Sequence, residues 1–60
     1  MTLEELRAKR ASLLAEAESL LTRAAGTDLA GDDAARFDAI TAEVDATDVL
    51  ITRHEDVLRM

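Results

Sequence analysis

The stretch LEELRAKRASLLAEAESLLTRA, residues 3–24, repeats a mostly apolar position at alternating intervals of three and four residues. The repeat falls on Leu3, Leu6, Arg10, Leu13, Ala17, Leu20 and Ala24. A second stretch, FDAITAEVDATDVLITRHEDVL at residues 37–58, has the same spacing. Its repeat falls on Phe37, Ile40, Val44, Thr47, Ile51, His54 and Leu58. A spacing of about 3.5 residues keeps one face of a helix against a neighbour, so two packed helices are predicted.

The two repeats come into register when the chain folds back so that facing residue numbers add to 57. The facing apolar residues form a predicted seam: Leu6 with Ile51, Leu13 with Val44, Ala17 with Ile40, and Leu20 with Phe37. Arg10 shares a polar layer with Thr47 and can pair with Asp48 across the seam. The prediction is an all-α fold, a coiled-coil-like antiparallel two-helix hairpin. It occupies one domain, residues 1–60, with helices at about 3–25 and 32–59 and a turn at 26–31.

Residues around the helix ends support these limits. Thr2 and Glu5 have the spacing of a capping box, in which each side chain bonds the other residue's backbone amide. Gly26 is the expected residue just after the first helix, and Leu29 is expected to tuck between the helix ends. For the second helix, Gly31 or Asp32 is a suitable N-cap and Ala30 is not. Leu14 and Leu21 broaden the apolar stripe of the first helix, as a core-facing helix requires.

The second helix is predicted to be the longer one, so its C-terminal end extends past the first helix. That end is apolar over a broad arc, of which the first helix covers only part. We expect the uncovered part to meet another subunit or a following domain, because large exposed apolar patches mark interaction sites, and we take it as a candidate self-association surface. Its residues are Val49, Leu50, Val57 and Leu58.

Composition and charge exclude several classes of partner. The net charge of −6 lies in residues 26–60, and no basic stripe is left to bind the phosphates of a nucleic acid. The longest apolar run, Val49 to Ile51, is far shorter than the roughly 20 residues of a membrane span. The chain has no cysteine, and Glu4 and Glu5 stand where a signal peptide would be basic and then apolar. We expect a soluble protein that binds neither nucleic acid nor membrane.

Candidate chemistry is sparse. His54 has no metal-ligating residue one helical turn away, because positions 50 and 58 are leucines. The acidic stretch 28–38 lacks the alternating oxygen ligands, the glycine and the final glutamate of a calcium loop. Two short helices also cannot enclose a pocket of catalytic groups. We therefore expect neither an enzyme nor a cofactor or metal site.

One enzyme family shares a short pattern with the chain. Residues 44–51, VDATDVLI, resemble the hydrophobic-Asp-x-x-Asp pattern of helical chorismate mutases. That family uses a third helix and several cationic residues that converge on a dicarboxylate. The chain has no third predicted helix, and the matching region is acidic.

A second resemblance spans nearly the whole chain. An opening L-x-x-L-R-x-K-R at residues 3–10 is followed by an Ala/Glu/Leu-rich helix and then by DLAGDDAARFDAITAEVD at residues 28–45. This order is similar to the N-terminal scaffolding (delta) segment of major capsid proteins of Hong Kong 97-type tailed phages. Their pattern is D-L-T-x-E-E-x-x-x-F-D followed by A-E-I-D. Ala30 and Gly31 depart from it at the helix cap, and the shell-forming domain is missing from these 60 residues.

The resemblance implies a non-enzymatic role in capsid assembly. Such a segment organises capsid subunits inside the procapsid, in the host cytoplasm, and a maturation protease then removes it. Its partners would be other copies of itself, the capsid shell domain, neighbouring capsid subunits and that protease. It would form the N-terminal part of a longer precursor that continues past Met60. The alternative is a generic small coiled-coil dimerisation or adaptor module.

Overall fold

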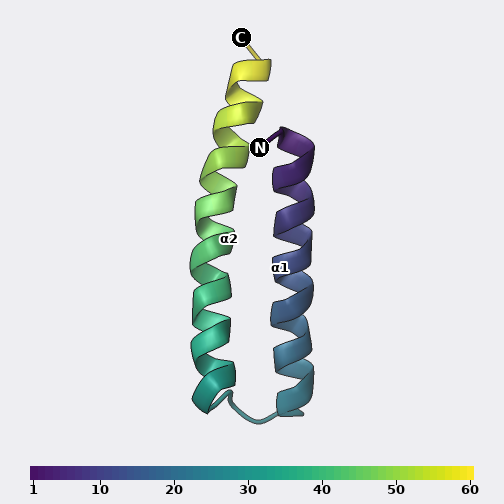
Figure 1. Ribbon diagram of the computed structural model, residues 1–60, viewed down its shortest axis with the longest axis vertical. Helices are drawn as coiled ribbons and strands as arrows, with labels where there is room; N and C mark the ends of the chain where they lie inside the picture. Colours follow the sequence, from purple (N-terminus) through teal and green to yellow (C-terminus); the bar gives the residue numbers. More distant parts are fainter.

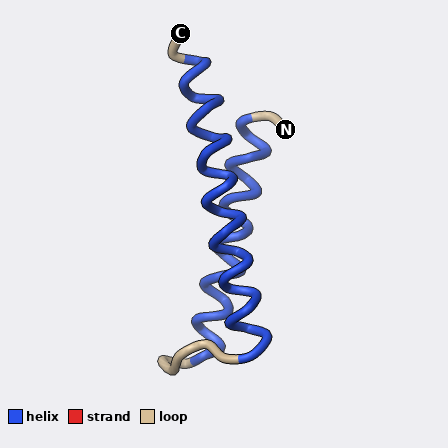
Figure 2. The backbone as a smooth tube through the Cα atoms, turned by 90° about the vertical axis from the view of Figure 1, so that its left-hand side faces the viewer, coloured by secondary structure: helices blue, strands red, loops and turns tan.

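The computed structural model describes residues 1–60 as two helices, α1 (Leu3–Ala24) and α2 (Gly31–Leu58), with no strand. The helices run antiparallel and side by side, joined by one short loop at one end (Figures 1 and 2). The molecule is a rod of 46 × 17 × 14 Å. This confirms the predicted all-α antiparallel hairpin. Because α2 has 28 residues and α1 has 22, the C-terminal end of α2 projects beyond the start of α1 (Figure 1).

The core is a single line of side chains between the helices. Leu6, Leu13, Leu20 and Ile40 are its four buried apolar residues. Half-buried side chains complete the line: Ala17, Leu29, Phe37 and Val44 pack against the cluster of Leu13, Leu20 and Ile40. Ile51 is half-buried farther along α2. The structure thus places all eight predicted seam residues in buried or half-buried positions.

A polar layer interrupts this line near its middle. Thr47 is buried, and its hydroxyl donates a hydrogen bond to the Glu43 carbonyl one turn earlier, at 2.7 Å. That bond satisfies the hydroxyl within its own helix, so its burial leaves no unpaired polar atom. Arg10 extends from the seam to the flank, where its Nε lies 2.5 Å from Asp48 Oδ1. The ion pair predicted between Arg10 and Asp48 is therefore present.

Ion pairs line both flanks of the seam. Those between the helices are Arg7–Glu55, Lys9–Glu43, Arg10–Asp48, Glu16–Arg36 and Arg23–Asp33. The Glu16 hydrogen bond raises the pKa of Arg36 above its ordinary value. The side chains of these pairs are between 41% and 64% exposed, and ion pairs this open to water contribute about 0–1 kcal/mol each. They help to specify the register but cannot replace the buried seam.

The predicted capping box begins α1. The Thr2 hydroxyl accepts from the Glu5 amide at 3.1 Å, and Glu5 Oε1 accepts from the Thr2 amide at 2.9 Å. The backbone hydrogen bond from Thr2, and then that from its side chain, hold the pKa of Glu5 below its ordinary value of 4.5. A lowered folded-state pKa means that the cap stabilises the helix above pH 4.5. Its contribution is lost as the pH falls through the lowered pKa.

The limits of the helices differ from prediction in three details. Helix α1 ends at Ala24 rather than Ala25, because Ala25 already has a left-handed backbone (φ 55°, ψ 43°) and Gly26 follows with φ 86°. Helix α2 begins at Gly31 rather than 32, and it ends at Leu58 rather than 59. Each limit shifts by one residue, as is common at helix ends, which fray.

The N-cap of α2 was predicted wrongly. Ala30 holds that position in extended conformation and makes no side-chain cap hydrogen bond, whereas Gly31 and Asp32 lie within the helix. The glycine explains the difference, because Gly31 has φ 59° and so permits an abrupt entry into the helix that other residues resist. Asp32 and Asp33 remain in the first turn, where their charges suit the helix dipole. Leu29 is half-buried against the core, as expected of a residue tucked between the helix ends.

Ile40 provides the sharpest test of the seam, because only 1% of its surface is exposed. Ile40→Ala should lower the free energy of unfolding by about 2–5 kcal/mol, through lost burial and the cavity it leaves. The control Asp38→Ala lies on the exposed face and should change it by less than about 0.5 kcal/mol. Circular dichroism melts at one fixed concentration measure both. Equal effects of the two substitutions would contradict this register.

Ala25 provides a test of the turn. A left-handed backbone costs an L-residue about 1–2 kcal/mol, a cost that glycine avoids. Glycine also gives the unfolded chain more freedom, which offsets part of the gain. Ala25→Gly should therefore raise the free energy of unfolding by about 0.5–1 kcal/mol in denaturant titrations. Gly26 has φ 86°, so Gly26→Ala should lower the free energy of unfolding. A rise in that free energy would contradict the left-handed turn.

Candidate self-association surface

The C-terminal end of α2 carries the largest group of uncovered apolar side chains. Val49 and Leu50 are 51% and 45% exposed, and Val57 and Leu58 are 65% and 74% exposed. Ile51, in the same segment, is half-buried because it faces α1. The four residues predicted as a self-association surface are therefore all accessible to a partner.

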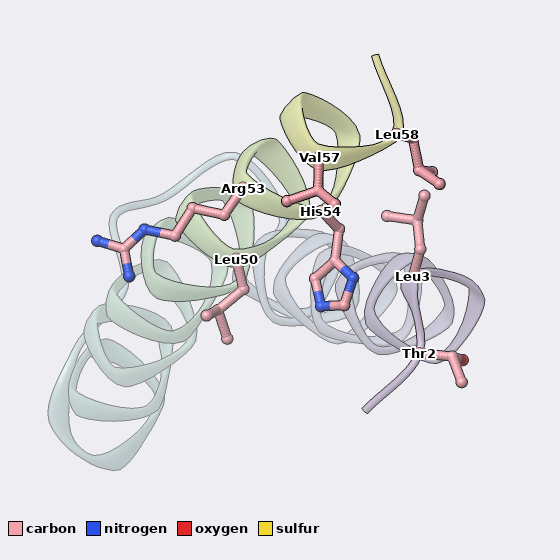
Figure 3. Close-up of a pocket in the computed structure, with 7 residues that line it drawn as sticks. All are labelled: Thr2, Leu3, Leu50, Arg53, His54, Val57 and Leu58. Carbon is pink, nitrogen blue, oxygen red and sulfur yellow. The ribbon is translucent and has the colours of Figure 1, made fainter. Parts of the chain in front are cut away.

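Three of these four residues line one open hollow of about 660 Å³ where the start of α1 meets the projecting end of α2. Its full lining is Thr2, Leu3, Leu50, Arg53, His54, Val57 and Leu58. Figure 3 shows Leu3, from the first turn of α1, with its side chain directed toward Leu58 of α2. Val49 lies on the adjoining face, in a shallower depression with Asp48, Thr52 and Arg53. The predicted surface is thus one concave apolar site with Val49 at its side.

Arg53 gives the hollow its charge. Every other arginine and the single lysine forms an ion pair with a carboxylate within the chain. Arg53 forms none, and Figure 3 shows its side chain directed to the side away from Leu3 and His54. The hollow therefore combines aliphatic walls with one guanidinium that has no carboxylate partner. A helix with apolar side chains and an acidic residue between them complements both properties.

His54 lines the hollow at the end of the seam, beside the start of α1. It is exposed, and nowhere in the chain do three or more His, Cys, Asp or Glu residues gather in a way that could hold a metal ion. Neither helix is both long enough and apolar enough to cross a lipid bilayer.

Sequence reasoning assigned Leu14 and Leu21 to the core-facing stripe, and the structure does not bury them. They are 42% and 51% exposed, one heptad apart on α1. Each directly follows a buried leucine, Leu13 or Leu20, and so points about 100° away from it around the helix. A single facing helix covers only one ridge of side chains, so the next ridge remains open. A third helix would be needed to bury these two residues.

The hollow should make the fold dependent on concentration, because association adds apolar burial that the hairpin lacks. Helical content and melting temperature should rise with concentration, as measured by circular dichroism and analytical ultracentrifugation. Leu50→Ser with Val57→Ser should weaken association by about tenfold or more, since each buried residue contributes about 1.5–3 kcal/mol. Ala35→Ser with Ala42→Ser, also at exposed positions of α2, is the matched control. A melt of the unaltered chain that is independent of concentration would contradict the prediction.

The surface therefore has the shape and composition to bind a helix, and it lies where two helices end at different heights. In comparisons with known proteins, no family model, no curated protein and no solved structure matches the chain.

Proposed function

We propose that the chain is a capsid-assembly scaffolding segment of a Hong Kong 97-type major capsid protein precursor. It organises subunits inside the procapsid, and a maturation protease removes it afterwards. The observation that carries the proposal is the exposed apolar hollow of Leu50, Val57 and Leu58 on a hairpin with a minimal core. The order of residues 3–10 and 28–45 is similar to that of the scaffolding segments, and this similarity is why we propose a role in capsid assembly rather than in association alone.

The size of the core supports a role in association. Only four apolar side chains of the 60 residues are buried, and Ile40 alone among them is fully buried. Chains of this length are marginally stable unless a disulfide, a metal or association adds to the core. The chain has no cysteine, and its acidic and imidazole groups form no metal cluster. Association is therefore the available source of additional stability.

Repetition turns such a weak contact into a specific one. Copies held together by their shell domains would meet at high effective concentration, so each hairpin contact can be weak and the set still strong. Capsid subunits alone can form shells of more than one curvature. Repeated contacts between hairpins would favour one of them.

The charge of the surface fits a position inside a shell. The outward side of α2 bears Asp38 and Asp45, neither of which pairs with a cation. An acidic lining repels the phosphates of DNA. Such a lining suits a segment that occupies the interior before packaging and is removed before DNA enters.

The gene itself gives the first test. On the scaffolding proposal, the reading frame continues past Met60 into a large mixed α/β shell domain. A stop codon directly after Met60, or a following domain unrelated to shell formation, would contradict the proposal. Either result would favour the dimerisation or adaptor module instead.

Particle assembly gives the second test. Deleting residues 1–60 from the precursor should leave the shell domain folded but unable to form closed shells of uniform size. Leu50→Ser with Val57→Ser should reproduce part of this defect, and Ala35→Ser with Ala42→Ser should not. Electron microscopy of particles expressed from each gene measures the result. Uniform, closed shells from the deletion would contradict a scaffolding role.

A further inference from the structure

Two exposed stripes on the chain have the same pattern with opposite charge. On α1, Leu14 and Leu21 are separated by Glu18. On α2, Leu50 and Val57 are separated by Arg53. Each stripe therefore places one charged side chain between two large apolar ones a heptad apart. Neither Glu18 nor Arg53 has an ion-pair partner within the chain.

The stripes lie on opposite flanks of the hairpin. Leu14 and Leu21 share a heptad position with Arg7, which pairs with Glu55 on one flank. Leu50 and Val57 share a heptad position with Arg36 and Glu43. These two pair with Glu16 and Lys9 on the other flank. One hairpin therefore cannot bring its own two stripes together, and a second copy can.

The spacing of the stripes specifies how they fit. Along the α1 stripe, Glu18 follows Leu14 after four residues, and Leu21 follows Glu18 after three. Read backwards, the α2 stripe has the same spacing: Arg53 precedes Val57 by four residues, and Leu50 precedes Arg53 by three. An antiparallel pairing whose residue numbers add to 71 thus sets Leu14 on Val57, Glu18 on Arg53, and Leu21 on Leu50. A parallel pairing that sets Leu14 on Leu50 would place Glu18 opposite His54 rather than Arg53.

We propose that the hollow at the end of α2 binds α1 of a second copy of this chain, antiparallel, with Glu18 of one copy paired to Arg53 of the other. The contact buries Leu14 and Leu21 against Leu50 and Val57, the apolar residues that a single hairpin leaves open on its two flanks. The polar pair at its centre resembles the Arg10–Thr47 layer of the hairpin seam in position and role. This interface rests on the self-association in the proposed function and identifies its second surface.

The interface is head-to-tail, since each copy contributes a different stripe to each of its two neighbours. Neighbouring hairpins point the same way and are staggered along their axes. Facing residue numbers add to 57 within one hairpin and to 71 between copies. The neighbouring copy is therefore displaced by 14 residues, which is about 21 Å along the helix. Because each copy is displaced in the same direction along the axis, this head-to-tail contact does not saturate at a dimer and builds an open chain.

Cysteine cross-linking tests this geometry, because the natural chain has no cysteine. A mixture of Leu14→Cys and Val57→Cys chains should form disulfide-linked heterodimers under mild oxidation. Each variant alone should cross-link about tenfold more slowly, because identical stripes do not meet. Leu14→Cys mixed with Leu50→Cys is the control for register, since it would link only in the parallel pairing. A chain that carries both Leu14→Cys and Val57→Cys should give a ladder of oligomers on a denaturing gel.

Charge reversal tests the central pair independently. Glu18→Arg or Arg53→Glu alone should weaken association by about tenfold, since each sets like charges opposite one another. Mixing the two variants, or combining both changes in one chain, should restore it. Asp38→Arg makes the same charge change at an unpaired position outside both stripes and should leave association unchanged. Sedimentation velocity measures the association, and circular dichroism should show helical content falling in each single variant and recovering when the two variants are mixed.

Three results would overturn the interface. In the first, Val57→Cys alone forms disulfide dimers as fast as the mixture forms heterodimers. In the second, cross-links form only between positions 14 and 50. In the third, mixing the two charge variants does not restore association. All of these experiments use the 60-residue chain, so they are independent of any shell. A cross-linked ladder together with normal shells from the deletion would contradict the scaffolding role and leave the interface standing. Defective shells without the cross-links would do the reverse.

Discussion

The structure depends on a single line of contacts between two helices. In each helix the residues that can face the other recur about every 3.5 positions, so the whole core is one row of side chains. Leu6, Leu13, Leu20 and Ile40 are buried because they occupy that row. No other element contributes to the core, and the loop adds only Leu29. Stability, register and the exposed surface all follow from this row.

One consequence is that apolar residues outside the row stay exposed. Leu14 and Leu21 on one flank, and Leu50 and Val57 on the other, are each a single position away from the seam. In a larger domain a third helix would cover them. In a two-helix molecule they remain uncovered, so the property that limits the core of the hairpin also leaves two apolar stripes exposed. The unequal helix lengths deepen one of these surfaces into the hollow beside Leu3 and Leu58.

The seam was predictable from sequence because it depends on periodicity, which sequence states directly. The same holds for the capping box of Thr2 and Glu5, where two residue types at a fixed spacing nearly determine the geometry. The entry into α2 was not predictable, because it depends on how the loop closes. Gly31 can adopt either sign of φ, and its positive φ in the folded chain is what places Ala30 at the cap. The exposure of Leu14 and Leu21 was missed because their periodicity indicates an apolar face without indicating how many helices cover it.

Polar layers explain how so small a core can still select one register. Apolar rows alone tolerate a shift by one heptad, because leucine, isoleucine and valine pack acceptably in several pairings. A shift of the hairpin by seven residues would separate Arg10 from Asp48 and would replace Thr47 opposite Arg10 with another residue. A polar group within a helix seam lowers stability and penalises every register but one. Because little apolar surface is buried in the seam, its register can be specific even though the contact is weak.

In the interface proposed between copies, Glu18 and Arg53 would act in the same way. Selectivity there would come from a charged layer rather than from the amount of apolar surface buried.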